Sequence, residues 1–442
     1  MRRAPPWLRP PPPPLMQTSM TIASASPSAV PATTTRQDGT VMGLVGLAHL
    51  ISHFSQLLLP PLFPWLKEAF HVGYTELGVL LTIFFTVSCA VQALSGFIVD
   101  RFGPRPILFG GISLIAFAAF GFSISTSYWM MAGFVVVAGI GNGVFHPVDY
   151  TLLNRKIHSS RLGHAFSVHG ITGSLGWALA PAMMSTLALA FSWRVALASA
   201  GVLALVVLAV LALNRSHLTI EMTSANAAPG SPRSGGKRNE DSNLGFLAIP
   251  AVWMCFAFFF LYAVVISGVQ AFAPEAARQL HDVPTRWAAL CLTFYMVASA
   301  SGMVLGGFLA ADPSRCEKIV AVGFSLAAVV ALTIGYAPLA PMAVPVLFVL
   351  MGAAAGIAGP SRDLIVKRAA PPNATGRVYG VVYSGLDIGQ AVAPLVFGTL
   401  MDLHRYADVW LGIAIVQAAL ITTAFNVHRA RRTAPAPAAA TA

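Results

Sequence analysis

Three long apolar runs of the sequence carry polar side chains at helical spacing. The three sets are His49, His53 and Gln56; Asn142, His146 and Asp149; and Tyr383, Asp387 and Gln390. Spacings of three, four or seven residues place the members of each set on one helix face. An ionisable side chain inside a membrane-spanning helix is costly, so it usually faces a cavity or a partner and is a functional candidate.

The second set combines a carboxylate and an imidazole around a proline. Proline lacks a backbone N–H, so we expect Pro147 to open the hydrogen-bond ladder beside His146 and Asp149. A carboxylate and an imidazole on one face can load and release a proton near neutral pH. We predict that His146, Asp149 and Asp387 couple to protons. The structural alternative is that His146 bonds a neighbouring carbonyl and Asp149 caps a broken turn.

The other polar residues of these faces offer hydrogen-bonding groups for a small solute. The predicted solute-binding residues are His49, His53, Gln56, Asn142, Tyr262, Tyr383 and Gln390. His49 and His53 also have the i, i+4 spacing of metal ligands, but no third ligand lies near them in the sequence. We therefore predict no metal site and no cofactor. His164 and His169 lie near the end of an apolar run, and we assign them packing or surface roles.

The composition indicates which elements must position these residues. Of the 442 residues, 56% are hydrophobic and 10% are charged, whereas soluble domains have about 25% charged residues. A membrane-spanning helix needs about 20 apolar residues. Such runs are centred near residues 50, 86, 116, 139, 177, 203, 258, 297, 327, 352, 389 and 417. We predict an all-α membrane protein with twelve transmembrane helices.

The basic residues fall on one side of this arrangement. The net charge is +11, and 22 of the 27 Lys and Arg residues lie in the termini and alternate loops on one side. Cytoplasmic loops are enriched in Lys and Arg, so both termini are predicted to be cytoplasmic. The basic loops are scattered and lack interleaved aromatic residues, which argues against nucleic-acid binding.

The chain contains an internal repeat. A shift of 213 residues pairs Gly139 with Gly352, Gly143 with Gly356, Pro147 with Pro360, Gly176 with Gly389 and Pro181 with Pro394. We predict two pseudo-symmetric six-helix bundles. The predicted order is a disordered tail (1–40), a bundle (41–213), a cytoplasmic linker rich in Gly, Ser and Pro (214–243), a second bundle (244–428) and a disordered tail (429–442).

The repeat also suggests a gate. Asp149 corresponds to Arg362 at this shift, so opposite charges stand at equivalent positions of the two bundles. We predict that these two residues close an inner gate between the bundles.

One loop carries a family motif. Gly96, Asp100, Arg101, Gly103 and Arg105 form the pattern G-x-x-x-D-R-x-G-x-R. Gly96 would let helices approach closely, Asp100 would cap a neighbouring helix N-terminus, Gly103 would permit a tight turn, and the arginines would hold the loop inside. The pattern resembles the signature loop of the major facilitator superfamily, which implies a gating role for these residues.

Two further segments narrow the resemblance. Gly170, Gly173, Gly176 and Pro181 resemble the Gly/Pro-rich fifth helix of exporters in this family. The segments 52–67 and 144–149 resemble the fosmidomycin-resistance branch of drug exporters, although Val148 separates the proline from the acid here. The family arrangement implies that the three polar faces point at one central aqueous site.

The resemblance implies a secondary active transporter rather than an enzyme. We expect proton-coupled efflux of a small amphipathic or anionic compound by alternating access, in a monomer of the bacterial inner membrane. The alternative is proton-coupled uptake of a small organic solute. A membrane enzyme or a passive channel is less favoured, because the sequence shows no nucleophile–base constellation and the two-fold repeat suits alternating access.

Overall fold

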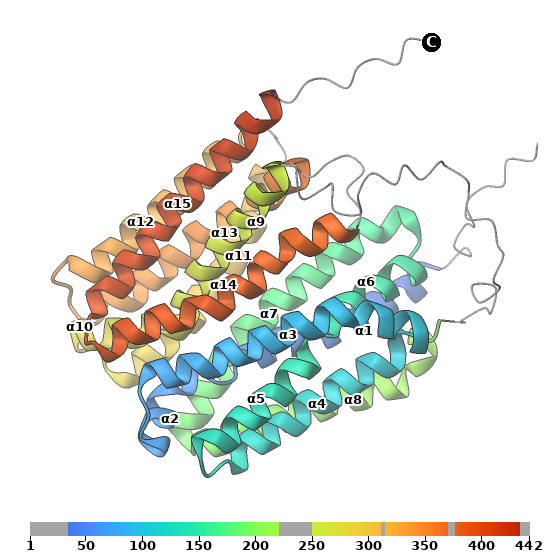
Figure 1. Ribbon diagram of the computed structural model, residues 1–442, viewed down its shortest axis with the longest axis horizontal. Coiled ribbons are helices and arrows are strands. Elements are labelled where there is room, and N and C mark those ends of the chain that lie inside the picture. The colour runs from blue at the N-terminus through green and yellow to red at the C-terminus, as the bar shows by residue number, and fades with distance from the viewer. Residues whose placement is uncertain (1–33, 221–249, 311–313, 370–375, 434–442) are drawn as a thin grey trace, which may run out of the picture.

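The protein is a bundle of helices that run roughly side by side (Figure 1). The structure is a computed structural model, and it describes residues 34–220, 250–310, 314–369 and 376–433. Within these ranges the regular elements are α-helices and short 3-10 helices. The predicted all-α fold is confirmed.

The N-terminal half, residues 35–213, contains six long segments. They are α1 (Thr35–Gln56), α3 (Tyr74–Phe102), α4 (Pro104–Ile124), α5 (Tyr128–Asn142) with α6 (Phe145–Lys156), α7 (Leu162–Ala190) and α8 (Trp193–Leu213). Three short elements connect them: η2 (Pro60–Leu62), α2 (Phe63–Phe70) and η3 (Ser159–Arg161).

The C-terminal half, residues 250–433, repeats the pattern with six long helices. They are α9 (Pro250–Ala271), α11 (Thr285–Leu309), α12 (Cys316–Tyr336), α13 (Ala343–Ala369), α14 (Gly376–Asp402) and α15 (Tyr406–Thr433). The short helix α10 (Ala273–His281) follows α9 as α2 follows α1. Each of the twelve predicted centres falls in one of these twelve segments.

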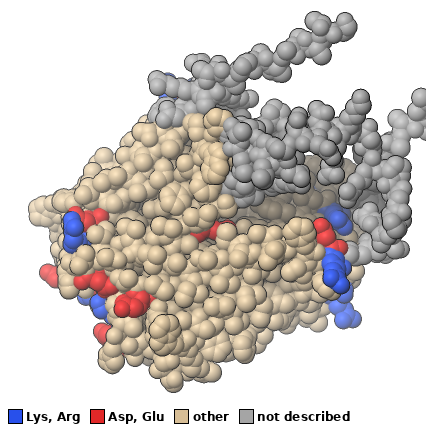
Figure 2. Space-filling model, viewed as in Figure 1, with Lys and Arg blue, Asp and Glu red and all other residues tan. Residues whose placement is uncertain are grey.

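The helices are apolar enough to cross a membrane. Eleven segments of the described chain pass a test of length and hydropathy, and α14 is the twelfth long element, packed against α9 and α3. Most charged side chains on the visible face gather near its two ends, with uncharged residues between them (Figure 2). This distribution fits a protein that spans a bilayer.

Both outer boundaries of the bundle differ from the prediction. Helix α1 begins at Thr35 rather than at residue 41, because Thr34 and Gln37 form a capping box that an apolar pattern does not reveal. Helix α15 continues to Thr433, past the predicted end at 428. The predicted linker starts with the 3-10 helix η4 (Arg215–Leu218). Residues 1–33, 221–249 and 434–442 lie outside the described residues, as do the disordered segments predicted there.

Glycine contacts show that the sequence repeat is also a structural repeat. A Cβ on Gly139 would lie 2.9 Å from the carbonyl oxygen of Phe84, and one on Gly352 would lie 2.2 Å from that of Tyr295. Gly176 and Gly389 make matching contacts, with helices α1 and α9 respectively. Glycine is required at these positions because the paired backbones approach so closely.

The two halves meet more closely at one end of the bundle than at the other. We call the end that carries α2 and α10 the short-helix end, and the end that carries Gly103, η3 and η4 the linker end. At the short-helix end both halves share one apolar core, in which the rings of Phe63 and Phe272 lie 5.8 Å apart. At the linker end each half has a separate core. Contacts between the halves run along α3 with α14 and along α7 with α11.

Candidate functional site

A break in the fourth membrane segment positions the first polar group. Helix α5 ends at Asn142 and α6 begins at Phe145. A Cβ on Gly143 would lie 2.5 Å from the carbonyl oxygen of Ser88, so the chain passes α3 at close range where it breaks. The hydrogen-bond ladder that we predicted Pro147 to open is interrupted at Gly143 and Val144, just before the proline. Pro147 lies in the first turn of α6, where a missing N–H costs no hydrogen bond.

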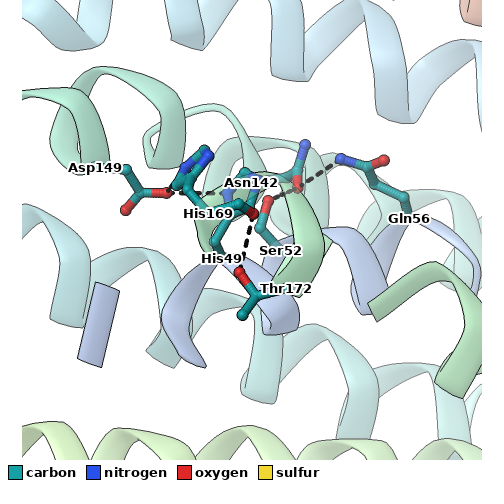
Figure 3. Close-up of polar contacts among 7 residues, drawn as sticks. All are labelled: His49, Ser52, Gln56, Asn142, Asp149, His169 and Thr172. Carbon is teal, nitrogen blue, oxygen red and sulfur yellow. Dashed lines mark hydrogen bonds and ion pairs between the residues drawn. The ribbon is translucent and has the colours of Figure 1, made fainter. Parts of the chain in front are cut away.

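Asp149 is the centre of the site and is 0% exposed. Its Oδ2 atom lies 3.0 Å from Nδ1 of His49 on α1 and 3.1 Å from Nε2 of His169 on α7 (Figure 3). An ionised carboxylate only accepts hydrogen bonds, so each imidazole donates from the nitrogen that faces it. Three helices of the N-terminal half therefore converge on one carboxylate oxygen.

His146 and Asp149, which we predicted as a protonatable pair, share no hydrogen bond in the structure. Nδ1 of His146 is buried without a hydrogen-bond partner, as is Oδ1 of Asp149. The ring of His146 lies 5.3 Å from that of His49 and stacks on Tyr150 at 6.0 Å. The prediction missed the hydrogen-bond partners of Asp149, because it considered only neighbours along α6 and these partners come from two other helices.

His169 was assigned a packing or surface role, and this was also wrong. Its side chain is buried beside Asp149, with its ring stacked on that of His49 at 3.5 Å. His164 is exposed, as expected for a surface residue. A signal for His169 was present in the sequence: it shares the i, i+4, i+7 face of α7 with Gly173 and Gly176. A Cβ on Gly173 would lie 3.0 Å from Nε2 of His49, so this face of α7 contacts α1 closely.

A second polar group lies further along α1. Asn142 Oδ1 accepts a hydrogen bond from the Ser52 hydroxyl at 2.8 Å, and its Nδ2 donates to the Ser88 hydroxyl at 2.8 Å. Gln56 Nε2 approaches Asn142 Oδ1 at 3.5 Å, and Gln56 Oε1 accepts from Trp177 Nε1 at 3.0 Å (Figure 3).

His53 lies between the two groups. Its ring is 4.4 Å from His49 and 4.4 Å from Trp177, and its Nδ1 is buried without a hydrogen-bond partner. The predicted set of His49, His53, Gln56 and Asn142 is thus brought together in one place.

The third predicted face lies elsewhere. Asp387 on α14 accepts a hydrogen bond from Gln92 of α3 at 3.2 Å, which links the two halves. Gln390 is buried on α14, and the side chain of Tyr383 lies outside the described residues. Asp387 contacts α3 rather than the group around Asp149. The expected convergence of three faces therefore holds for the faces of α1 and α5–α6 only.

The predicted gate between Asp149 and Arg362 is not formed in this arrangement. Both described interactions of the Asp149 carboxylate are with histidines of its own half. Arg362 instead contacts a residue of its own, C-terminal half: its guanidinium lies 4.0 Å from the ring centre of Tyr262. Tyr262, which we predicted to bind solute, therefore contacts a charged side chain of its own half.

The motif loop follows the prediction in part. Gly103 has φ +81°, a conformation that suits glycine, so the predicted tight turn is confirmed. Arg105 donates to the Thr219 hydroxyl at 2.8 Å, and the guanidinium of Arg101 lies 5.2 Å from the ring of Phe102.

Two predictions for this loop do not match the structure. A Cβ on Gly96 would meet nothing within 4 Å, so this glycine allows no close helix contact here. Asp100 is exposed at the end of α3 and caps no helix among the described residues. Gly96 and Asp100 lie at the linker end, where the two halves have separate cores. The helices that these two residues would contact are therefore separated there.

The structure supplies the third ligand that the sequence lacked for a metal site. Nitrogens of His49, His146 and His169 lie within 4.8 Å of one another. In the structure two of the three histidines bond the same carboxylate oxygen of Asp149, so their facing nitrogens act as hydrogen-bond donors.

Comparison with known proteins agrees with this architecture. A sequence model of the Major Facilitator Superfamily matches residues 45–394 and 288–440. A bacterial homologue of the human lysosomal transporter Spinster, in an inward-facing and occupied conformation, aligns with a TM-score of 0.69 at 15% identity, over 91% of this chain and 98% of that chain. The nucleoside transporter NupG aligns with a TM-score of 0.68 at 13% identity, over 88% and 99%.

Sequence relatives come from several bacteria. The fosmidomycin resistance protein of Escherichia coli is 24% identical over 293 residues, which is 63% of this chain and 67% of that protein. The MFS-type transporter YfnC of Bacillus subtilis is 25% identical over 142 residues, which is 32% of this chain and only 34% of the relative. The membrane sensor protein UhpC of Escherichia coli is 27% identical over 165 residues, or 37% of each chain.

Twelve long helices in two repeated halves, together with the match to the family model, define a multi-pass membrane transporter rather than an enzyme. The chain belongs to the Major Facilitator Superfamily. The predicted family, fold and resemblance to the fosmidomycin-resistance branch are confirmed.

Proposed function

We propose that this protein exports a small amphipathic or anionic compound in exchange for protons, by alternating access across a bacterial inner membrane, as a monomer. The observation that carries the proposal is Asp149, a carboxylate with no exposure inside an apolar bundle, beside a group of unused hydrogen-bonding atoms. A carboxylate is costly in such a place unless it has a function or a partner. The fosmidomycin resistance relative supports the choice of export.

Protons are the proposed coupling ion because both carboxylates have partners that a protonation change would disturb. Asp149 is held by two imidazoles. Asp387 bonds Gln92 across the two halves, so its protonation would change a contact that opens and closes during transport. His146, whose Nδ1 has no partner, would exchange protons with Asp149.

The arrangement of the halves suits a state open at the linker end. The cores are shared at the short-helix end and separate at the linker end. Excess Lys and Arg would place the linker end and both termini in the cytoplasm. Gly96, Asp100, Arg101 and Arg105 would then serve the opposite state, in which the linker end closes and Arg362 can approach Asp149.

Uptake coupled to protons is the alternative, because the polar site by itself sets no direction. Cells with and without the protein, screened against a panel of drugs and organic anions, separate the two. Export predicts higher resistance, and uptake predicts higher sensitivity or growth on the solute. The same screen with Asp149→Asn and Asp387→Asn tests the coupling residues, with Asp408→Asn, a partly exposed acid outside the polar groups, as the control. Unchanged resistance in both site variants would reject proton coupling through these residues.

A further inference from the structure

The polar residues on one face of α1 fall into two separate groups. The first is His49 with Asp149 and His169, and the second is Ser52 with Asn142 and Ser88. Figure 3 shows Asp149 and His169 on one side of the view and Gln56 on the other, with Ser52 and Asn142 between them. Among the residues that the structure describes, no hydrogen bond joins the two groups.

We infer that His49, Asp149 and His169 form a site for a single proton, and that His169 is a proton-holding residue. This site is separate from the second group, Ser52, Asn142 and Ser88, to which we assign solute binding and which we call the solute-binding group. This inference deepens the proposed function, because it names the atoms that would hold the exchanged proton.

The geometry of the two imidazoles carries the first step. Nδ1 of His49 and Nε2 of His169 both face Oδ2 of Asp149, at 3.0 and 3.1 Å. Each ring already donates from this nitrogen, so an added proton takes the far nitrogen of one ring, and the resulting imidazolium keeps its hydrogen bond to the same carboxylate oxygen. The charge is shared among three groups from three helices, which are α1, α6 and α7.

The stacking of the rings limits the number of protons. The rings of His49 and His169 lie 3.5 Å apart with an angle of 23° between their planes. Two imidazolium charges at this distance, with little water present, would repel each other strongly. One added proton leaves an imidazolium beside a carboxylate, which is close to neutral and suited to an apolar bundle. A second proton is excluded, so the site holds one.

A path for the proton lies on α6. Nδ1 of His146 and Oδ1 of Asp149 are buried and have no hydrogen-bond partner. The ring of His146 lies next to Tyr150, which is 42% exposed. The titratable groups that face the site are His53 on α1 and His146 and Tyr150 on α6. His146 is the group placed between the site and the surface.

Helix α1 connects the proton site to the solute-binding group. His49, Ser52 and Gln56 lie on one face of this helix at i, i+3 and i+7. Gly173 and Gly176 bring the α7 backbone against α1, so the two helices are closely packed beside both groups. A change in charge at His49 therefore displaces the residues that bind the solute.

The test uses the purified full-length protein in lipid, without any solute. Infrared difference spectra follow the carboxylate bands of Asp149, which shift when a hydrogen-bonded imidazole gains a proton, between about pH 5 and pH 8, and a pH-indicator dye counts the protons taken up. His169→Gln keeps a donor at the position of Nε2 and His49→Asn keeps one at Nδ1, but neither can hold a charge. His164→Gln is the matched control, because His164 is exposed on the same helix.

The expected uptake in the wild type exceeds that in Asp149→Asn by one proton per molecule. His169→Gln and His49→Asn are each expected to shift the midpoint by at least about one pH unit, a tenfold change in proton affinity, and His164→Gln to leave it unchanged. Midpoints that stay at the wild-type value in both site variants overturn the inference, as does a difference of two protons. Each variant is used only if its thermal unfolding matches that of His164→Gln. If His169→Gln fails this requirement, His169→Asn replaces it.

The result also separates this inference from the proposed function. If the midpoints shift as expected but Asp149→Asn transports normally, the proton site stands and the proposed function fails. If export depends on protons while the midpoints do not move, the function stands and the inference fails.

Discussion

Asp402, at the end of α14, caps the first turn of α3 through Thr75. Oδ2 of Asp402 accepts hydrogen bonds from the backbone nitrogen of Thr75 at 2.8 Å and from its hydroxyl at 2.6 Å. Oδ1 accepts from the backbone nitrogen of Tyr74 at 2.7 Å. A carboxylate at a helix N-terminus satisfies unpaired N–H groups and interacts favourably with the helix dipole. This contact joins the two halves at the short-helix end.

Asp402→Ala is expected to favour opening of the short-helix end. Asp402 is partly exposed, so we expect a loss of about 1–2 kcal/mol, which is about a 5- to 30-fold shift in the population of the two states. Distances between spin labels placed on α2 and α10 measure this population. Asp408→Ala is the control, because Asp408 pairs with Arg405 within the same half. Equal populations in wild type and Asp402→Ala would show that the cap does not hold the halves together.

The glycines of α7 provide a second prediction. A Cβ on Gly176 would lie 2.4 Å from the carbonyl oxygen of Leu50 on α1, whereas one on Gly170 would meet nothing within 4 Å. Overpacking costs about 1–3 kcal/mol. We therefore expect Gly176→Ala to lower the thermal unfolding midpoint in detergent and Gly170→Ala to leave it unchanged or raise it. Similar midpoints for both variants would mean that α1 and α7 are not in close contact.

A buried ion pair on α10 gives a third prediction. Glu275 is 7% exposed and accepts two hydrogen bonds from Arg278, at 2.7 and 2.8 Å. These bonds raise the pKa of Arg278 above its usual value, so its charge persists throughout the accessible pH range. Arg278→Ala leaves the carboxylate without this partner, and we expect a loss of about 1–3 kcal/mol on unfolding.

An exposed pair with the same spacing is the control for that variant. Arg405 and Asp408 are also three residues apart, but the Arg405 side chain is 60% exposed. Arg405→Ala should cost less than about 1 kcal/mol, because surface pairs contribute little. The double variant Arg278→Ala with Glu275→Gln should recover part of the lost stability. Equal losses for Arg278→Ala and Arg405→Ala would indicate that burial of Glu275 is unimportant.

The solute-binding group gives a fourth prediction. Asn142 is 8% exposed and bonds the hydroxyls of both Ser52 and Ser88. Once a transported compound is found, Asn142→Ala should raise its KM about 5- to 150-fold, since an unsatisfied buried polar group costs about 1–3 kcal/mol. The pH dependence of transport should not change, because Asn142 does not contact Asp149. Asn154→Ala, at an exposed asparagine of α6, should leave KM unaltered.

Much of the fold could be predicted because it follows from local patterns. Each apolar run of about 20 residues must form a helix in a bilayer, which satisfies its own backbone hydrogen bonds. Gly103 marked a turn by its type, and the paired glycines of the repeat marked close helix contacts. The cap at Thr34 and the extension of α15 were missed, because the polar residues at these helix ends lie outside the apolar runs from which the helices were predicted.

The sequence by itself determined the twelve helices, the repeat and the family, and it identified Asp149, His49 and Asn142 as candidates by their place in apolar runs. Only the tertiary structure decided which of them touch. Helical spacing reports neighbours on one helix, and it therefore paired Asp149 with His146. The packing of α1, α6 and α7 instead brings His49 and His169 to Asp149, because contacts between helices depend on how their faces are rotated against one another.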